Sequence, residues 1–181
     1  MNEAHRVTPI LLWGMMGAGK SALAQYLCDD LGLRSIDLDT LVARTFGQSV
    51  SQLIQTRGID WFRATEREQL LSVLDEHRFQ VIALGGGTLL DPALREAVRG
   101  RAYLCTLTAH PHVLSQRVAR QMGQRPLLIG SASEIESKLN ELVEERQDAY
   151  LDADCVIDTT DLTVPQLAEL IIPLFLSSEA A

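Results

Sequence analysis

Residues 14–21 of the chain read Gly14-Met15-Met16-Gly17-Ala18-Gly19-Lys20-Ser21. This stretch satisfies the phosphate-binding pattern GxxxxGK[ST] at every specified position. Glycines in such a loop let backbone N–H groups turn inward at the start of a helix, where they form a nest for an anion. The Lys20 amine then reaches the terminal phosphates of a nucleotide, and the Ser21 hydroxyl is a ligand for Mg²⁺. The stretch therefore predicts a nucleotide-binding loop between a strand and a helix.

Short apolar runs alternate with longer amphipathic segments on both sides of this loop. Strands are expected at 8–13, 34–36, 81–84, 103–107 and 155–157, and helices at 21–31, 49–56, 59–76, 92–98, 111–121, 132–150 and 165–176. Such alternation implies crossover connections and a parallel sheet covered on both faces, which is a three-layer α/β domain. Ligands of such sheets bind beyond the carboxyl ends of the strands. The loops at Gly14, Asp37 and Gly85 should therefore gather at one edge.

Composition and charge exclude several classes of protein. The net charge of −8 argues against a nucleic-acid-binding surface, which is normally basic. No apolar run reaches the roughly 20 residues of a membrane helix, and the N-terminus lacks the pattern of a secretory signal. The widely spaced Cys28, Cys105 and Cys155 are interpreted as buried core thiols of a reducing compartment. We therefore expect a cytoplasmic protein with no membrane and no nucleic-acid partner.

Carboxylates follow the second expected strand. Asp37 and Asp39 are one residue apart, and on an extended chain they would point the same way, one toward a metal and one toward a substrate. An equally good interpretation is a turn in which Asp39 caps the following helix. Their place shortly after the phosphate loop favours the functional interpretation.

An arginine–glutamate pair and a run of glycines come next. Arg63 and Glu66 share a helix face, and by themselves they indicate a solvated ion pair. The glycines at 85–87 follow an apolar strand, which favours close approach of the backbone to a ligand over a loose connection.

Two further arginines stand in less specific surroundings. Arg125 lies between Gly123 and Gly130, which suggests a lid that closes and excludes water, although an ordinary surface loop would be preferred without the other motifs. Arg146 could pair with neighbouring carboxylates or meet a substrate anion, and the sequence does not decide between them.

Taken in this order, the motifs closely resemble the shikimate kinases, small P-loop kinases related to the nucleoside monophosphate kinases. The resemblance runs from about Pro9 to about Thr159 and rests on the phosphate loop and on later motifs. These are Asp37-Leu38-Asp39, Phe62-Arg63 with Glu66, Gly85-Gly86-Gly87, Arg125-Pro126-Leu127-Leu128, and Arg146 with Tyr150. It implies one P-loop kinase domain over residues 1–181, with a substrate-binding insertion at about 38–70 and a mobile lid at about 121–133.

The resemblance also implies substrates and residue roles. ATP and shikimate would be the small-molecule substrates, Mg²⁺ the cofactor, and a monomer the expected state. Lys20, Asp39 and Arg125 would be catalytic, and Ser21 and Asp37 would organise Mg²⁺. ATP would contact Gly14, Gly17, Ala18, Gly19, Lys20, Ser21, Ala22 and Arg125, with adenine on Arg117 or Arg120, and shikimate would contact Asp39, Arg63, Gly85, Gly86, Gly87 and Arg146.

The chain departs from the family pattern at three positions that have no direct chemical role. Ile59 and Ala43 stand where the family usually has glutamate, and Ile54 stands where an aromatic residue often lines the pocket. The rival interpretations are another small P-loop kinase, acting on gluconate or a nucleotide, and a non-catalytic ATP-binding module.

Overall fold

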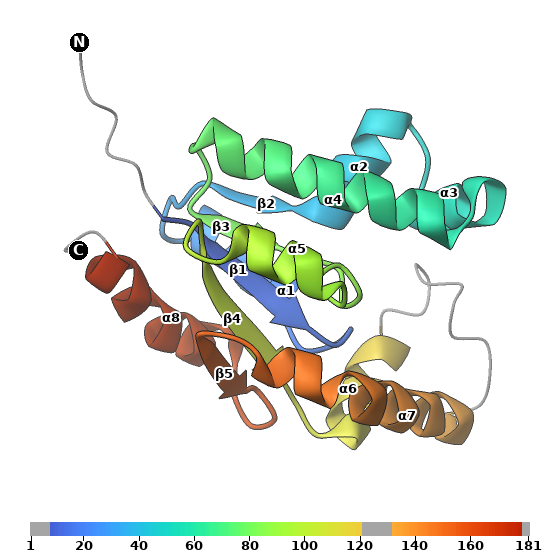
Figure 1. The fold of residues 1–181 in the computed structure, drawn as a ribbon. Coiled ribbons are helices and arrows are strands. Elements are labelled where there is room, and N and C mark those ends of the chain that lie inside the picture. The colour runs from blue at the N-terminus through green and yellow to red at the C-terminus, as the bar shows by residue number, and fades with distance from the viewer. Residues whose placement is uncertain (1–7, 121–131, 179–181) are drawn as a thin grey trace, which may run out of the picture.

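The computed structural model describes residues 8–120 and 132–178. Five strands form one parallel sheet in the order β2-β3-β1-β4-β5 (Figure 1). They are β1 (Ile10–Gly14), β2 (Ser35–Asp37), β3 (Val81–Ala83), β4 (Tyr103–Thr108) and β5 (Cys155–Asp158). The predicted α/β fold with a five-stranded parallel sheet is confirmed.

The central strand β1 is buried along its whole length. Its residue Leu11 pairs with Ile82 of β3 on one side and with Leu104 of β4 on the other. A parallel strand covered on both faces needs apolar side chains at every position, which explains the unbroken apolar run of β1.

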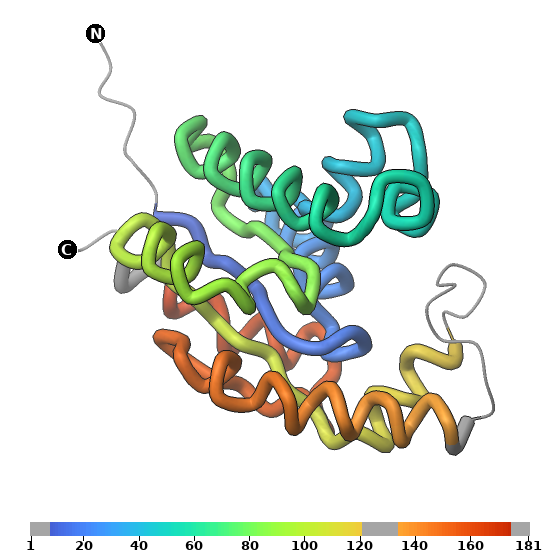
Figure 2. Tube along the Cα trace, turned by 45° about the vertical axis from the view of Figure 1, so that its right-hand side comes forward, coloured from blue at the N-terminus to red at the C-terminus, as the bar shows by residue number. Residues whose placement is uncertain are grey.

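Helices connect the strands and cover the sheet. They are α1 (Lys20–Asp29), α2 (Leu38–Phe46), α3 (Val50–Arg57), α4 (Ile59–Glu76), α5 (Pro92–Val98), α6 (Pro111–Ala119), α7 (Ala132–Leu151) and α8 (Val164–Ser178). Helices α2, α3 and α4 group on one side of the molecule, and α6 and α7 lie together on the opposite side (Figures 1 and 2). Within the described ranges, no helix is both long and apolar enough to cross a membrane.

The segment after β2 differs from the sequence-based expectation. Asp37 ends the strand and caps α2, because its Oδ1 accepts a hydrogen bond from the Thr40 N–H at 2.9 Å. Asp39 therefore lies in the first turn of a helix. The prediction that both carboxylates point the same way from an extended chain is wrong, because capping by Asp37 starts the helix directly after the strand.

The cysteines also differ in part from the expectation. Cys105 is buried in β4, as predicted, whereas Cys28 and Cys155 are only half-buried. Cys155 lies on β5, an edge strand of the sheet, where only one neighbouring strand covers it. The prediction of three buried core thiols is therefore wrong for two of them.

Candidate active site

The phosphate loop joins β1 to α1, and its glycines adopt backbone conformations that other residues rarely reach. Gly14, Gly17 and Gly19 have φ values of 121°, 83° and 103°. A side chain at Gly14 would also collide with the backbone carbonyl of Leu107 on β4. Gly19 is the N-cap of α1 and supplies no side-chain cap. The first N–H groups of α1 therefore face the loop, which is the arrangement of an anion nest.

The side chain of Lys20 folds back onto the start of this loop. Its side chain is 8% exposed, and its Nζ donates hydrogen bonds to the carbonyl oxygens of Gly14 at 2.8 Å and Met15 at 2.9 Å. These bonds hold the ammonium group over the nest, where a bound anion would meet both the helix N-terminus and the lysine.

A hydroxyl and a carboxylate lie together at the start of α1. The Ser21 Oγ donates a 2.6 Å hydrogen bond to Asp37 Oδ2. Such hard oxygen ligands suit Mg²⁺, which usually binds one or two protein oxygens together with water and phosphate. In the described ranges, no three His, Cys, Asp or Glu side chains gather to hold an ion by themselves. The pair therefore fits a metal whose other ligands come from a nucleotide and water.

A pocket of about 260 Å³ opens beside the loop. Arg117 of α6 lines it, and its Nη2 donates to the Thr159 carbonyl at 2.7 Å while Nη1 donates to the Thr159 hydroxyl at 3.0 Å. Arg120 is exposed at the C-terminal end of α6 and does not line this pocket. Its walls are Gly17, Ala18, Gly19, Lys20, Ser21, Ala22, Arg117, Thr159, Leu162, Thr163, Val164 and Leu167.

The glycine run at 85–87 follows β3, next to β1 in the sheet, and polar side chains pack directly on its backbone. A methyl group built on Gly85 would lie 2.8 Å from Glu66 Oε1 and 3.0 Å from Asp39 Oδ1, and one on Gly87 would collide with Arg63. Glycine is therefore required here because three polar side chains approach the chain closely. The structure brings together the predicted acceptor-side residues of α2, α4 and this loop.

Glu66 organises this side of the site. It is 1% exposed, accepts a hydrogen bond from the Thr88 hydroxyl at 2.7 Å, and forms an ion pair with Arg63 Nη1. The interpretation as a solvated ion pair is wrong, because the carboxylate is buried under the glycine loop. In the sequence, the signal for a joint role of Glu66 and Arg63 is their spacing of three residues, which places both on one helix face.

Arg146 reaches the other side of the glycine loop from α7. Its Nη1 would lie 3.8 Å from a methyl group on Gly86, and its Nε is buried with no hydrogen-bond partner among the described residues. A buried donor left without a partner is costly and therefore suggests a ligand that supplies the acceptor. Arg125 and nearly all of the predicted lid lie outside the described residues.

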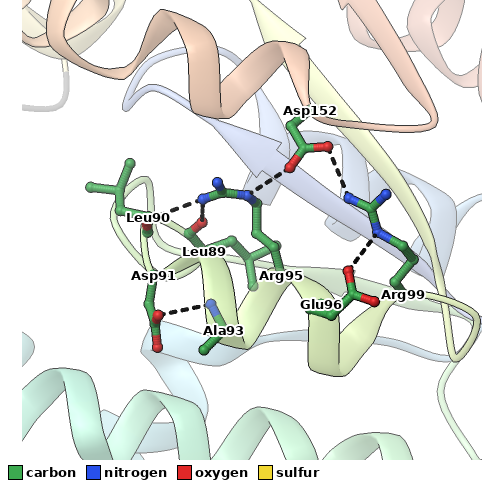
Figure 3. A network of polar contacts seen from close by, with 8 residues as sticks. All are labelled: Leu89, Leu90, Asp91, Ala93, Arg95, Glu96, Arg99 and Asp152. Carbon is green, nitrogen blue, oxygen red and sulfur yellow. Dashed lines mark hydrogen bonds and ion pairs between the residues drawn. The ribbon is translucent and has the colours of Figure 1, made fainter.

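A second polar network anchors Leu89 and Leu90, which follow the glycine run in the same loop (Figure 3). Arg95 of α5 donates to the carbonyl oxygens of Leu89 at 2.7 Å and Leu90 at 3.1 Å, and its Nε donates to Asp152 Oδ2 at 3.1 Å. Hydrogen bonds from Arg99 and then Arg95 hold the pKa of Asp152 below its ordinary value. Because Asp152 follows α7, the network links the glycine loop to the helix that carries Arg146.

Comparison with known proteins identifies the family. A protein-family model described as shikimate kinase matches residues 16–174. The chain belongs to the shikimate kinase family. A shikimate kinase of Caldanaerobacter subterraneus is 33% identical over 169 residues, covering 92% of this chain and 95% of the relative. One from Thermus thermophilus is 33% identical, covering 91% of this chain and 88% of the relative.

Solved structures agree with this assignment. The shikimate kinase of Acinetobacter baumannii in complex with shikimate superposes with a TM-score of 0.83 at 30% identity, covering 99% of both chains. A gluconokinase of Sinorhizobium meliloti, with a TM-score of 0.51 at 15% identity, shares the fold alone.

Proposed function

We propose that this protein is an ATP-dependent kinase that transfers the γ-phosphate of ATP to the 3-hydroxyl of shikimate, giving 3-phosphoshikimate and ADP in chorismate biosynthesis. One observation supports it above the others: the phosphate loop touches the glycine loop. A methyl group on Gly86 would lie 3.1 Å from the carbonyl oxygen of Gly14. A nucleotide on the first loop and an acceptor on the second would therefore have their reacting groups close together.

On the nucleotide side, Lys20 would hold the β- and γ-phosphates, with the backbone of Gly14 to Ala22 around them. Ser21 and Asp37 would hold Mg²⁺, which when bound neutralises charge on the phosphates. Arg117 is proposed for the adenine contact in preference to Arg120, because only Arg117 lines the pocket beside the loop.

On the acceptor side, two guanidinium groups would bind one carboxylate. Arg63 and Arg146 approach the glycine loop from different helices, and forked guanidinium donors match a carboxylate well. The backbone of residues 85–87 would form the floor of the pocket. Asp39, which packs against Gly85, would orient the attacking hydroxyl.

Phosphoryl transfer passes through a loose transition state, so catalysis depends mainly on positioning and on stabilisation of charge. In this scheme Asp39 accepts the hydroxyl proton late, and Lys20 stabilises the charge on the transferred group. Arg125 would complete the site as part of a lid at about 121–133.

We include in the proposal a single domain over residues 1–181, with the acceptor-binding insertion at about 38–70, acting as a monomer in the cytoplasm.

A coupled assay of ADP release tests the acceptor. Shikimate, gluconate and nucleoside monophosphates are offered separately with ATP and Mg²⁺, and Lys20→Ala serves as the inactive control. We expect turnover with shikimate alone. Preference for gluconate or a nucleotide would reject the proposed acceptor, and no turnover with any of them would favour a non-catalytic ATP-binding module.

A further inference from the structure

Tyr150 occupies a position between the two halves of the site. It lies near the C-terminal end of α7, is 3% exposed, and sends its hydroxyl toward both loops. Burial raises the pKa of this phenol, and the nearby guanidinium of Arg146 opposes that rise only in part. The group is therefore a neutral hydroxyl with one hydrogen to donate.

On the acceptor side, this hydroxyl is bonded to the glycine loop. Its oxygen lies 3.0 Å from the carbonyl oxygen of Gly86, the best acceptor within its reach. Arg146 interacts with the same hydroxyl and lies over the same glycine. A methyl group on Gly86 would lie 3.5 Å from this hydroxyl and 3.8 Å from Arg146 Nη1, so the phenol, bonded to the loop, restricts where the guanidinium can lie relative to the pocket floor.

On the nucleotide side, the contacts of Tyr150 within the described ranges are apolar or weak. Its ring meets Trp13 edge-to-face with centroids 4.7 Å apart, and its hydroxyl lies 3.2 Å from the thioether sulfur of Met15. A thioether is a weak acceptor, and neither contact involves the backbone N–H groups that would bind phosphate. Loss of the hydroxyl should therefore affect the acceptor side far more than the nucleotide side.

We propose that Tyr150 is a positioning residue for the acceptor: its hydroxyl holds the Arg146 guanidinium over the glycine loop, in the geometry in which the guanidinium receives the shikimate carboxylate. The inference rests on the proposed function, because it assumes shikimate as the ligand of this pocket. The buried Nε of Arg146 supports the inference. It has no hydrogen-bond partner among the described residues, so a donor of the positioned guanidinium is left for a ligand.

Tyr150→Phe tests this directly, because it keeps the ring against Trp13 and removes only the hydroxyl. Leaving buried polar partners unpaired should weaken shikimate binding about 5- to 30-fold, measured as Kd by calorimetry. The Kd of ADP should change by less than about threefold, since the contact to the phosphate loop is weak. Tyr103→Phe is the matched control, because Tyr103 is the first residue of β4 and lies at the amino-terminal end of the strands, away from both loops. It should leave both constants unchanged.

A double-mutant cycle with Arg146→Ala then asks whether Tyr150 acts through the arginine. If it does, the combined loss of shikimate affinity is much smaller than the product of the two single losses. Independent effects, or a lowered Tm with unchanged shikimate Kd, would overturn the inference. If the unmodified protein phosphorylates shikimate and Tyr150→Phe binds it normally, only this inference fails. If the unmodified protein does not bind shikimate, the proposed function fails with it.

Discussion

Replacing Glu66 with glutamine would remove the negative charge on which the acceptor side of the site is built. The carboxylate receives hydrogen bonds from Arg63 and from the Thr88 hydroxyl while it is 1% exposed. Glutamine has nearly the same shape, but one of its two terminal atoms is an NH₂ group. The amide oxygen would stay on Arg63 and the NH₂ group would face Thr88, whose hydroxyl can turn to accept, so both contacts remain but the bond from Arg63 loses its negatively charged acceptor.

The size of the effect follows from these contacts. A hydrogen bond to a charged group contributes about 1.5–3 kcal/mol. Because the Arg63 side chain is 38% exposed, water compensates for part of the weakened bond and the lower value applies. A cost of about 1.5 kcal/mol corresponds to roughly tenfold weaker shikimate binding if Arg63 must be re-ordered by the ligand. Loss of the charged acceptor should also lower Tm by roughly 3–6 °C in a chain of this size.

Calorimetry with shikimate and with ADP, combined with thermal unfolding, provides the measurement. The control is Glu68→Gln, an exposed glutamate two residues along the same helix, which should leave both affinities and Tm unchanged. Unchanged shikimate affinity in Glu66→Gln would show that the buried carboxylate does not order Arg63 for the ligand. An equal loss of ADP affinity would point to general damage instead.

Substitutions at four other residues separate the remaining roles. Lys20→Ala should lower kcat by about 10²–10³-fold or more with unchanged circular dichroism, and near-normal kcat would refute the phosphate role. Arg63→Ala and Arg146→Ala should each weaken shikimate binding by about 1.5–3 kcal/mol while sparing ATP, and equal losses for both ligands would contradict a carboxylate clamp. Asp39→Asn should lower kcat strongly but incompletely and Asp39→Ala more deeply, both measured at saturating Mg²⁺, whereas wild-type kcat in the alanine variant would place the acceptor elsewhere.

The geometry of the phosphate loop could be predicted because it is encoded locally. Eight consecutive residues from Gly14 to Ser21 specify a strand end, a left-handed turn and a helix start. Each glycine in the motif has a conformational or contact reason to be there. The positions of the strands then follow from short apolar runs, because a strand covered on both faces must be apolar throughout.

The environment of single side chains could not be predicted in the same way. Glu66 resembles any surface glutamate paired with an arginine three residues away, and its burial arises only when the glycine loop folds over α4. Arg117 and Arg120 lie three residues apart on one helix, yet only Arg117 meets Thr159, forty-two residues further along the chain. Such differences depend on which elements pack together, and a linear pattern does not contain that information.

The contact between the two loops illustrates both situations. Gly14 and the glycines at 85–87 are far apart in sequence, but they follow β1 and β3, which are neighbouring parallel strands and end at the same edge of the sheet. Topology alone therefore predicts that a nucleotide loop and an acceptor loop meet. Tyr150 reaches the same point from a helix on another side of the molecule, and nothing in the strand pattern requires a hydroxyl there. The sequence thus indicates which loops meet, whereas the side chains that pack against them become apparent only from their tertiary contacts.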